Sequence, residues 1–407
     1  MDVVYARCAG LDVHQKTVVA CARLPGPGGV THEVRSFGTS TRELLELADW
    51  LASRSCTHVA MESTGVYWKP VWHVLEGNFE LLLANAVHIR NIPGRKSDVN
   101  DATWIADLLA HGLIRGSFVP PAPIHELRDL TRTRKQLVRE ITQHTQRLQK
   151  VLEDANLKLT AVVSDIVGVS GRAILDALIA GETDPGRLAD LSTGRLKASR
   201  ATLVDALHGR VTAHHRFMLR LHLGQIDALE QAVREVEARI GDRLGPFRAA
   251  VQHLTTMPGV SETVARVIVA EIGVDMARFP TPGHLVSWAG LCPRLHESAG
   301  KRLSTRTRPG APWLKTTLVQ AAWAAVRRPG YLQAQFLRLK SRRGPKKAIL
   351  AVAASMLCAA YHIIRDGRPY TDLGADHFTR HDRAAIARRL IRRLNNLGLA
   401  VDVRPAA

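Results

Sequence analysis

The sequence has few cysteines, and those it has are scattered. There are five in 407 residues, and no two of them have the spacing of a zinc-binding or redox pair. This argues against a disulfide framework and a zinc site, and it is typical of a protein from a reducing cytoplasm. No signal peptide is recognisable either, because Met1 is followed by Asp2 and a strand-like segment.

Long hydrophobic runs are also missing. The most apolar stretch, residues 348–364, is rich in alanine and falls short of the length needed to span a bilayer. It predicts a buried helix, and we expect no membrane as a partner.

Acidic residues are too few to balance the basic ones. The chain has 56 lysines and arginines against 37 aspartates and glutamates, a formal net charge of +19 and a pI near 10.4. Such an excess is typical of proteins that bind nucleic acid, because it attracts the phosphate backbone.

Four carboxylates are nevertheless set where acids are locally out of place. Asp12 and Glu62 end apolar, strand-like runs, while Asp98 and Asp101 lie three residues apart at the start of an expected helix. The carboxyl ends of strands in an open sheet point toward the ligand crevice, and an i, i+3 pair faces one way along a helix. The four side chains can therefore converge.

Converging carboxylates repel one another unless a cation neutralises them. Oxygen ligands of this kind favour Mg²⁺ or Mn²⁺, and two such ions form a clamp for phosphoryl displacement. A basic protein with such a cluster fits a phosphodiester substrate. The alternative for any single acid is a solvated cap or turn residue.

The first 115 residues alternate between strand-like and helical patterns. Three strands followed by helix, strand, helix and strand is the order of a ribonuclease H-like fold. The expected strands are 5–13, 17–24, 32–37, 57–61 and 80–84, and the expected helices are 41–54 and 66–76.

Apolar residues at heptad-like spacing follow a proline-rich segment. They occur in two helical stretches, from Leu127 to Val151 and from Ile226 to Ile240, which predict either an antiparallel hairpin or a dimerising coiled coil. The alternative is an ordinary helical packing face. We expect four regions: an α/β domain at 1–118, a coiled-coil connector at 119–250, a mainly helical domain at 251–375 and a basic tail at 376–407.

Five sequence blocks resemble one known family. They are GLDVHQK at 10–16, MESTGVYW at 61–68, PGRKSDVNDA at 93–102, PGVSETVA at 258–265 and AGLCPR at 289–294. In this order and spacing they resemble the DEDD transposases of bacterial insertion sequences, the IS110 family, from about residue 5 to residue 370.

The resemblance implies a RuvC-like amino-terminal domain, a coiled-coil connector and a carboxy-terminal transposase domain. It also implies that Asp12, Glu62, Asp98 and Asp101 hold Mg²⁺ or Mn²⁺, and that Ser298 is a nucleophile. The implied partners are donor and target DNA, a structured non-coding bridge RNA and further copies of the chain as a dimer or tetramer. The expected location is the bacterial cytoplasm, associated with the nucleoid.

The basic residues we expect to contact nucleic acid are spread along the chain. They are Lys16, Arg95, Lys96, Arg294, Lys301, Arg302, Arg306, Arg308, Lys346 and Lys347. Several of them lie in what we expect to be a basic loop, HESAGKRLSTRTRPG, at 296–310.

The chain departs from the family at the nucleophile. The family commonly has Ser-Gly there, whereas here Ala299 stands between Ser298 and Gly300, which leaves Ser304 as the second choice.

Three other readings compete with the transposase. A hydrolytic RuvC-like endonuclease would use the same four acids with water as the nucleophile. A non-catalytic nucleic-acid-binding protein would need none of these acids. Actin-like and sugar-kinase ATPases begin with a similar strand order, but they need glycine-rich phosphate loops. The ESTG segment at 62–65 is one weak candidate for such a loop.

Overall fold

The computed structural model describes residues 2–63, 65–85, 89, 101–193, 198–293, 296–304, 306–308, 310–380 and 383–401. Within these ranges the side chains of 296, 298, 302, 379–380 and 383–386 are not described. The chain forms two compact units, Met1–Val119 and Pro120–Ala407. The finer boundaries at 118, 250 and 375 stay predictions.

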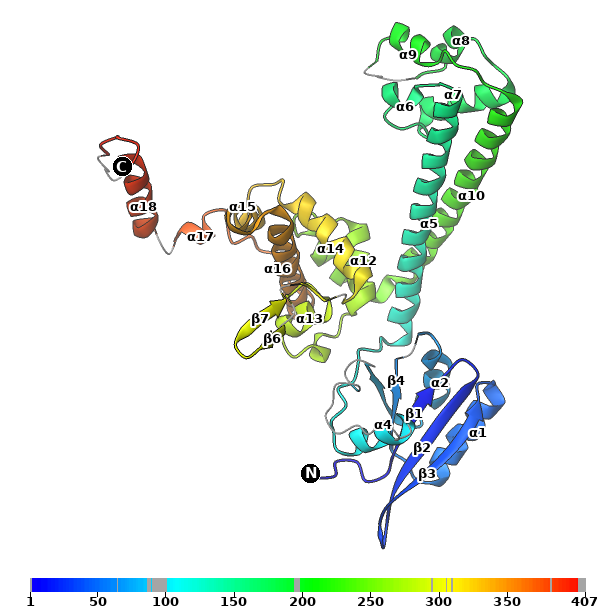
Figure 1. The fold of residues 1–407 in the computed structure, drawn as a ribbon, viewed down its shortest axis with the longest axis vertical. Helices are drawn as coiled ribbons and strands as arrows, with labels where there is room; N and C mark the ends of the chain where they lie inside the picture. Colours follow the sequence, from blue (N-terminus) through cyan, green and yellow to red (C-terminus); the bar gives the residue numbers. More distant parts are fainter. Residues whose placement is uncertain are drawn as a thin grey trace. The chain divides into compact units, whose positions relative to one another are not determined.

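The first unit is built on a five-stranded mixed sheet (Figure 1). Its strand order is β3-β2-β1-β4-β5, with β1, β2 and β3 antiparallel and with β4 and β5 parallel to β1. The strands are β1 (Cys8–Val13), β2 (Thr17–Gly26), β3 (Gly29–Gly38), β4 (His58–Glu62) and β5 (Glu80–Ala84).

Helices cover both faces of this sheet. One face packs on α1 (Thr41–Ser53) and α2 (Trp68–Leu75), where Leu11 and Met61 are buried among helix residues such as Leu47. The opposite face packs on α4 (Asp101–Ala110), where Cys8 lies in the same core as Ile105. The alternation of strand side chains thus gives the sheet two separate cores.

The expected α/β elements of this unit are confirmed, with small shifts at their ends. The β2–β3 hairpin is longer than predicted, because its pairing continues to Gly26 and Gly29 across the glycine-rich turn. The strand β1 begins at Cys8, three residues later than predicted.

The second unit is mainly helical, as predicted. Its first part holds α5 (Ala122–Asp154), α6 (Leu159–Val162), α7 (Val169–Ala180), α8 (Pro185–Asp190), α9 (Arg200–Ala206) and α10 (Ala213–Arg243). The rest holds η1 (Gly245–Phe247), α11 (Arg248–Thr255), α12 (Glu262–Ile272), η2 (Met276–Arg278), α13 (Pro282–Trp288), β6 (His296–Ser298), β7 (Lys301–Ser304), α14 (Pro312–Ala325), α15 (Tyr331–Arg343), α16 (Pro345–Asp366), α17 (His377–Arg380) and α18 (Arg383–Asn395).

The two long helices, α5 and α10, form an antiparallel hairpin within one chain (Figure 1). Polar pairs cross between them, including Arg134 Nε to Glu237 Oε1 at 2.7 Å. The small helices α6 to α9 join the far ends and share a core with the hairpin, in which Leu152 and Leu219 are buried. Of the two arrangements predicted for these stretches, the structure has the hairpin.

A buried carboxylate ties α5 to α12. The Glu271 side chain is 1% exposed and accepts two hydrogen bonds from Arg132, at 2.7 and 2.8 Å. One turn earlier, Arg128 donates to the backbone oxygens of Ala270 and Glu271 at the end of α12. Because a buried charge must be paired, this contact fixes the register of the two helices.

The alanine-rich stretch forms a longer helix than we predicted. Helix α16 has 22 residues and, by length and composition alone, could cross a membrane. Half of its apolar window is buried, however, and it packs against α13, α14 and α15. The prediction of a buried helix is therefore compatible with the structure, whereas the prediction that it is too short to span a bilayer is wrong.

Candidate functional site

The position of α4 on the sheet locates the predicted acids. A methyl group added at Gly10 would lie only 2.2 Å from the Ala102 carbonyl oxygen, so α4 touches the backbone of β1 there. Two residues earlier, Cys8 Sγ donates to the carbonyl oxygen of Ala106, at 3.5 Å. The direction of β1 from Cys8 to Asp12 is therefore the direction of α4 from Ala106 back to its first residue, Asp101. The end of β1 that carries Asp12 and the start of α4 lie on the same side.

Asp12 and Glu62 occupy matching positions on neighbouring strands. Strands β1 and β4 pair in parallel, with Gly10 opposite Ala60 and Leu11 opposite Met61, and the same register continued by one residue sets Asp12 beside Glu62. Because side chains alternate along a strand, Asp12 is on the same face as Gly10, which is the face covered by α4.

Three of the four acids thus belong to one face and one end of the sheet. The fourth, Asp98, lies outside the described residues, as does most of the segment before α4. Carboxylate oxygens are the donors that Mg²⁺ and Mn²⁺ take, so the residue types and their placement fit such an ion. Among the residues with described positions, no group of three or more potential ligands lies close enough to hold one.

His14 is a residue of the candidate site that sequence reasoning missed. Its Nε2 lies 3.1 Å from Asp12 Oδ2, and the Asp12 side chain is 21% exposed while that of His14 is 58% exposed. The signal was present, because residues two apart at the end of a strand share a face. A ring nitrogen that donates to a carboxylate oxygen orients the other oxygen.

The segment predicted as a basic loop forms a β-hairpin instead. Ser298 ends β6 and pairs with Lys301 of β7 across the two residues Ala299 and Gly300. Both turn residues have positive φ, +47° for Ala299 and +73° for Gly300, which are the signs found in a type I′ hairpin turn. The charge of the segment predicted a loop, whereas the two-residue turn lets the chain on either side of it pair as strands.

The departure from the family falls in this turn. Ala299 takes the left-handed conformation at the position where the family commonly has glycine, and a Cβ makes that conformation costly. Ser304 is at the other end of β7, where its Oγ accepts a hydrogen bond from the Arg306 amide at 3.2 Å. Ser304 thus has a local structural role, while only the backbone position of Ser298 is described.

The described basic residues are on the surface. Exposed side chains are Lys16, in the turn after β1, and Lys301, Arg306, Arg308, Lys346 and Lys347 in the second unit. The side chain of Arg302 is not described, and Arg95, Lys96 and Arg294 lie outside the described residues.

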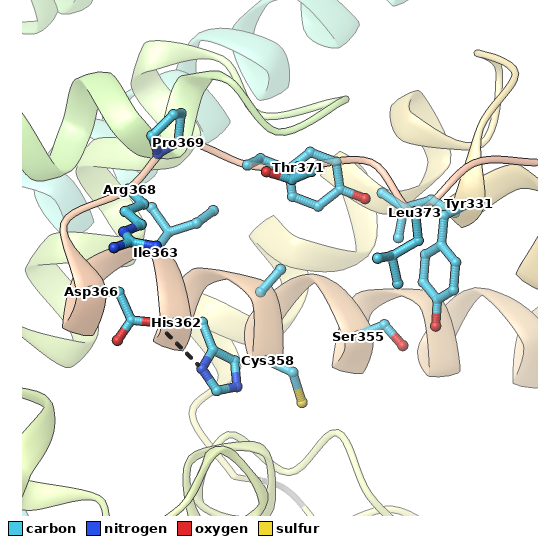
Figure 2. A pocket seen from close by; sticks show the side chains of 13 residues that line it. Tyr331, Ser355, Cys358, His362, Ile363, Asp366, Arg368, Pro369, Thr371 and Leu373 are labelled. Atoms are coloured by element: carbon cyan, nitrogen blue, oxygen red, sulfur yellow. Dashed lines mark ion pairs between the residues drawn. The ribbon is translucent and has the colours of Figure 1, made fainter. Parts of the chain in front are cut away.

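A pocket of about 490 Å³ lies elsewhere, between α15, α16 and the segment that follows α16. Figure 2 shows Tyr331, Ser355 and Cys358 along it, with an ion pair of His362 and Asp366 at one end. Its lining is mostly apolar and contains none of the predicted catalytic residues. It is therefore a poor site for phosphodiester chemistry.

Comparison with known proteins places the chain among the transposases. Residues 9–157 match the DEDD transposase domain of the IS110 type, and residues 251–337 match the transposase IS116/IS110/IS902 family. These two regions contain more than half of the chain. The chain belongs to the IS110 family of transposases.

Similar proteins come from several bacteria. A 43.6 kDa protein of insertion element IS110 from Streptomyces coelicolor is 29% identical over 148 residues, which is 36% of each chain. A pilin gene-inverting protein from Moraxella lacunata is 29% identical over 130 residues, 30% of this chain and 39% of the relative. The similarity covers little more than a third of these relatives' length.

Proposed function

We propose that this chain cuts and rejoins DNA as the transposase, or recombinase, of a bacterial insertion sequence. Family membership supports the assignment, and so does the similarity to the Moraxella pilin gene-inverting protein, since inverting a gene requires cutting and rejoining of DNA. We expect the protein to act in the cytoplasm, associated with the nucleoid, as a dimer or tetramer.

The observation that carries the proposal is the common placement of Asp12, Glu62 and Asp101. Strand register brings the first two to one face, and the contact of Gly10 with α4 brings the start of that helix to the same end. The strand order, three antiparallel strands followed by two parallel ones, supports a ribonuclease H-like fold of the RuvC type. With Asp98, these acids would hold Mg²⁺ or Mn²⁺.

A metal ion at these acids would offset charge on the phosphate under attack. The other contacts come from side chains of the chain. His14 orients Asp12 through a hydrogen bond, and the exposed lysines and arginines bind the phosphate backbone of the nucleic acid without reading its sequence. We further propose that a structured bridge RNA pairs with donor and target DNA, as the family resemblance implies.

Ser298 is the proposed nucleophile. Its Oγ would form an ester with the phosphorus while the bond to the leaving strand breaks, and that strand leaves as a sugar hydroxyl. A hydroxyl of the new strand would then attack the same phosphorus and release the serine. The covalent intermediate retains the energy of the phosphodiester bond, so rejoining needs no ATP.

The first test uses labelled DNA from the flanks of this gene together with an RNA transcribed from them. Asp12→Asn should reduce strand cleavage by at least about 100-fold, because a ligand charge is lost, while binding stays within about threefold. Asp49→Asn is the matched control, since Asp49 is exposed on α1, on the other face of the sheet. Full cleavage by Asp12→Asn would contradict the proposed site.

The second arm separates the serine mechanism from its rivals. Denaturing electrophoresis should show a protein-linked DNA product that disappears in Ser298→Ala and persists in Ser304→Ala. The reverse result would assign the nucleophile to Ser304. Cleavage with no covalent product would favour the hydrolytic endonuclease, and binding without any cleavage would favour the non-catalytic alternative.

A further inference from the structure

A cationic surface that the sequence did not reveal lies where α5 packs against the first turn of α14. Three cations of α5, Arg132, Lys135 and Arg139, surround the indole ring of Trp313, at 5.7, 5.7 and 5.5 Å from its centroid. Their spacing puts them on one face of the helix. None of them was among the residues predicted to contact nucleic acid.

Among the described residues, only one of these three cations forms an ion pair with a carboxylate. Arg132 is paired with the buried Glu271. Lys135 donates to two hydroxyls, Thr316 Oγ1 at 2.7 Å and Thr317 Oγ1 at 3.3 Å, and these hydroxyls already donate to carbonyl oxygens of their own helix. Within the part of the chain that is described, neither Lys135 nor Arg139 forms an ion pair with an acid.

The charge of the half-buried Lys135 is only partly compensated by the fold. Loss of hydration, together with the neighbouring Arg139, lowers the pKa of Lys135 from its ordinary value, and Glu271 offsets this only in part. An anion placed beside Lys135 would reverse that effect. Its ammonium has three N–H groups and uses two on the threonines, which leaves one for such an anion.

Another cation, Lys315, lies in the first turn of α14 itself, two residues after Trp313. Lys315 Nζ donates to Thr307 Oγ1 at 2.9 Å and to the carbonyl oxygen of Arg308 at 3.1 Å, and no ion pair with an acid is found for it among the described residues. These contacts tie the exposed Arg308 to the first turn of α14.

We infer that Lys135 and Arg139, which lie over the ring of Trp313, bind the phosphodiester backbone of a nucleic acid, and that Lys315 in the first turn of α14 adds a further positive charge. The inference rests on the proposed function for its ligand. Phosphates would pair with the charges of Lys135 and Arg139. The threonine hydroxyls already orient the Lys135 ammonium, and the Trp313 ring already orients the Arg139 guanidinium. The contact would position the nucleic acid without reading its sequence.

The test is the salt dependence of binding, measured by fluorescence anisotropy with a labelled 30-nucleotide single strand, its duplex and an RNA hairpin. Each lost phosphate contact should flatten the slope of log affinity against log salt by about 0.9 on duplex and about 0.7 on a single strand. Lys135→Gln with Arg139→Gln should therefore flatten it by roughly twice that amount. Loss on DNA alone or on RNA alone would identify the source of the phosphates.

The matched control is Lys150→Gln with Arg239→Gln. It removes the same charge from exposed positions on the same two-helix hairpin. If the control and the Lys135/Arg139 variant change the slope equally, or if neither changes it, the inference is overturned. If the wild type binds none of the three probes, the result contradicts the proposed function itself. If the wild type binds them and the Lys135/Arg139 variant binds with the same salt slope, the result contradicts only the inference about this surface.

A second variant tests the role of the ring. Trp313→Leu keeps every charge but removes the surface that orients Arg139, so affinity should fall by about three- to tenfold with an unchanged salt slope. Trp313→Phe should restore most of that affinity. Equal affinity of the Leu, Phe and wild-type proteins, with equal melting temperatures, would contradict the orienting role.

Discussion

At the scale of single residues, burial decides the chemistry of the cysteines. Cys8, Cys21 and Cys56 are all buried in the first unit, and all five cysteines of the chain are free thiols. Burial raises the pKa of Cys8 to about 12 and that of Cys56 to about 11, from a usual value of 9.0. Their lack of metal-like spacing in the sequence agrees with this role as small apolar core residues.

These raised pKa values predict a loss of stability at high pH. Between pH 9.0 and about 11 the unfolded chain ionises both thiols, while the folded unit keeps them protonated. Stability is therefore fully present below pH 9.0 and falls by about 1.4 kcal/mol per pH unit for each thiol through that window.

Urea unfolding, followed by pulsed alkylation of Cys8, measures this loss at pH 8.5 and pH 10.5. Cys56→Ala should show a shallower decline than the wild type, whereas Cys292→Ala, at a half-exposed position of the second unit, should not. Equal declines in all three proteins would mean that the buried thiols do not titrate as described.

At the scale of elements, the contact between β1 and α4 positions the candidate site. Gly10 has no side chain, which lets the helix backbone approach the strand directly. The start of α4, with Asp101, reaches the end of the strand that carries Asp12 only because of that approach.

Gly10→Ala should therefore damage stability and cleavage together. The new methyl group would lie 2.2 Å from Ala102 O and 2.4 Å from Ala106 N, both backbone atoms, so α4 must shift. We expect a loss of about 3 kcal/mol in the free energy of unfolding and a large loss of cleavage.

Gly28→Ala is the matched control, because nothing lies within 4 Å of a methyl group there. It should change the stability by less than about 0.5 kcal/mol. A Gly10→Ala protein with normal melting and normal cleavage would show that the close approach is unimportant.

The sequence predicted most elements of the first unit because strand alternation and helix periodicity are local signals. The sequence did not decide between an intramolecular hairpin and a dimerising coiled coil, since both bury the same stripe, from Leu127 to Val151. It also missed the pairing of His14 with Asp12 and the cations around Trp313. The first was readable from an i, i+2 spacing, but the second depends on the packing of α5 against α14, where contacting residues such as Lys135 and Thr316 are 181 positions apart in the sequence.

At the scale of the whole molecule, the two kinds of charge are distributed differently. The excess of +19 is spread over exposed lysines and arginines, while three of the four candidate catalytic acids, Asp12, Glu62 and Asp101, lie at one end of one sheet. Binding and chemistry should therefore respond to different substitutions, which is why Asp12→Asn is expected to bind normally.

The carboxy-terminal tail offers a test of the distributed charge. Ending the chain after Arg380 removes six arginines and two aspartates and lowers the formal net charge from +19 to +15. It keeps α17, whose Phe378 stacks on Tyr331 and lies under Arg338, so the rest of the unit should melt unchanged. Affinity for duplex DNA should fall, and the salt slope should flatten by up to about 5, or 0.9 for each arginine that contacts a phosphate.

A charge-preserving variant of the tail distinguishes electrostatic binding from apolar docking. Leu390 and Leu394 are exposed one turn apart on α18, beside Arg389 and Arg393. Changing both leucines to glutamine keeps the net charge, so an electrostatic tail should retain its affinity and its salt slope. If this variant loses as much affinity as the truncation, α18 contributes through its apolar face, and the positive charge of the tail is not what binds the nucleic acid.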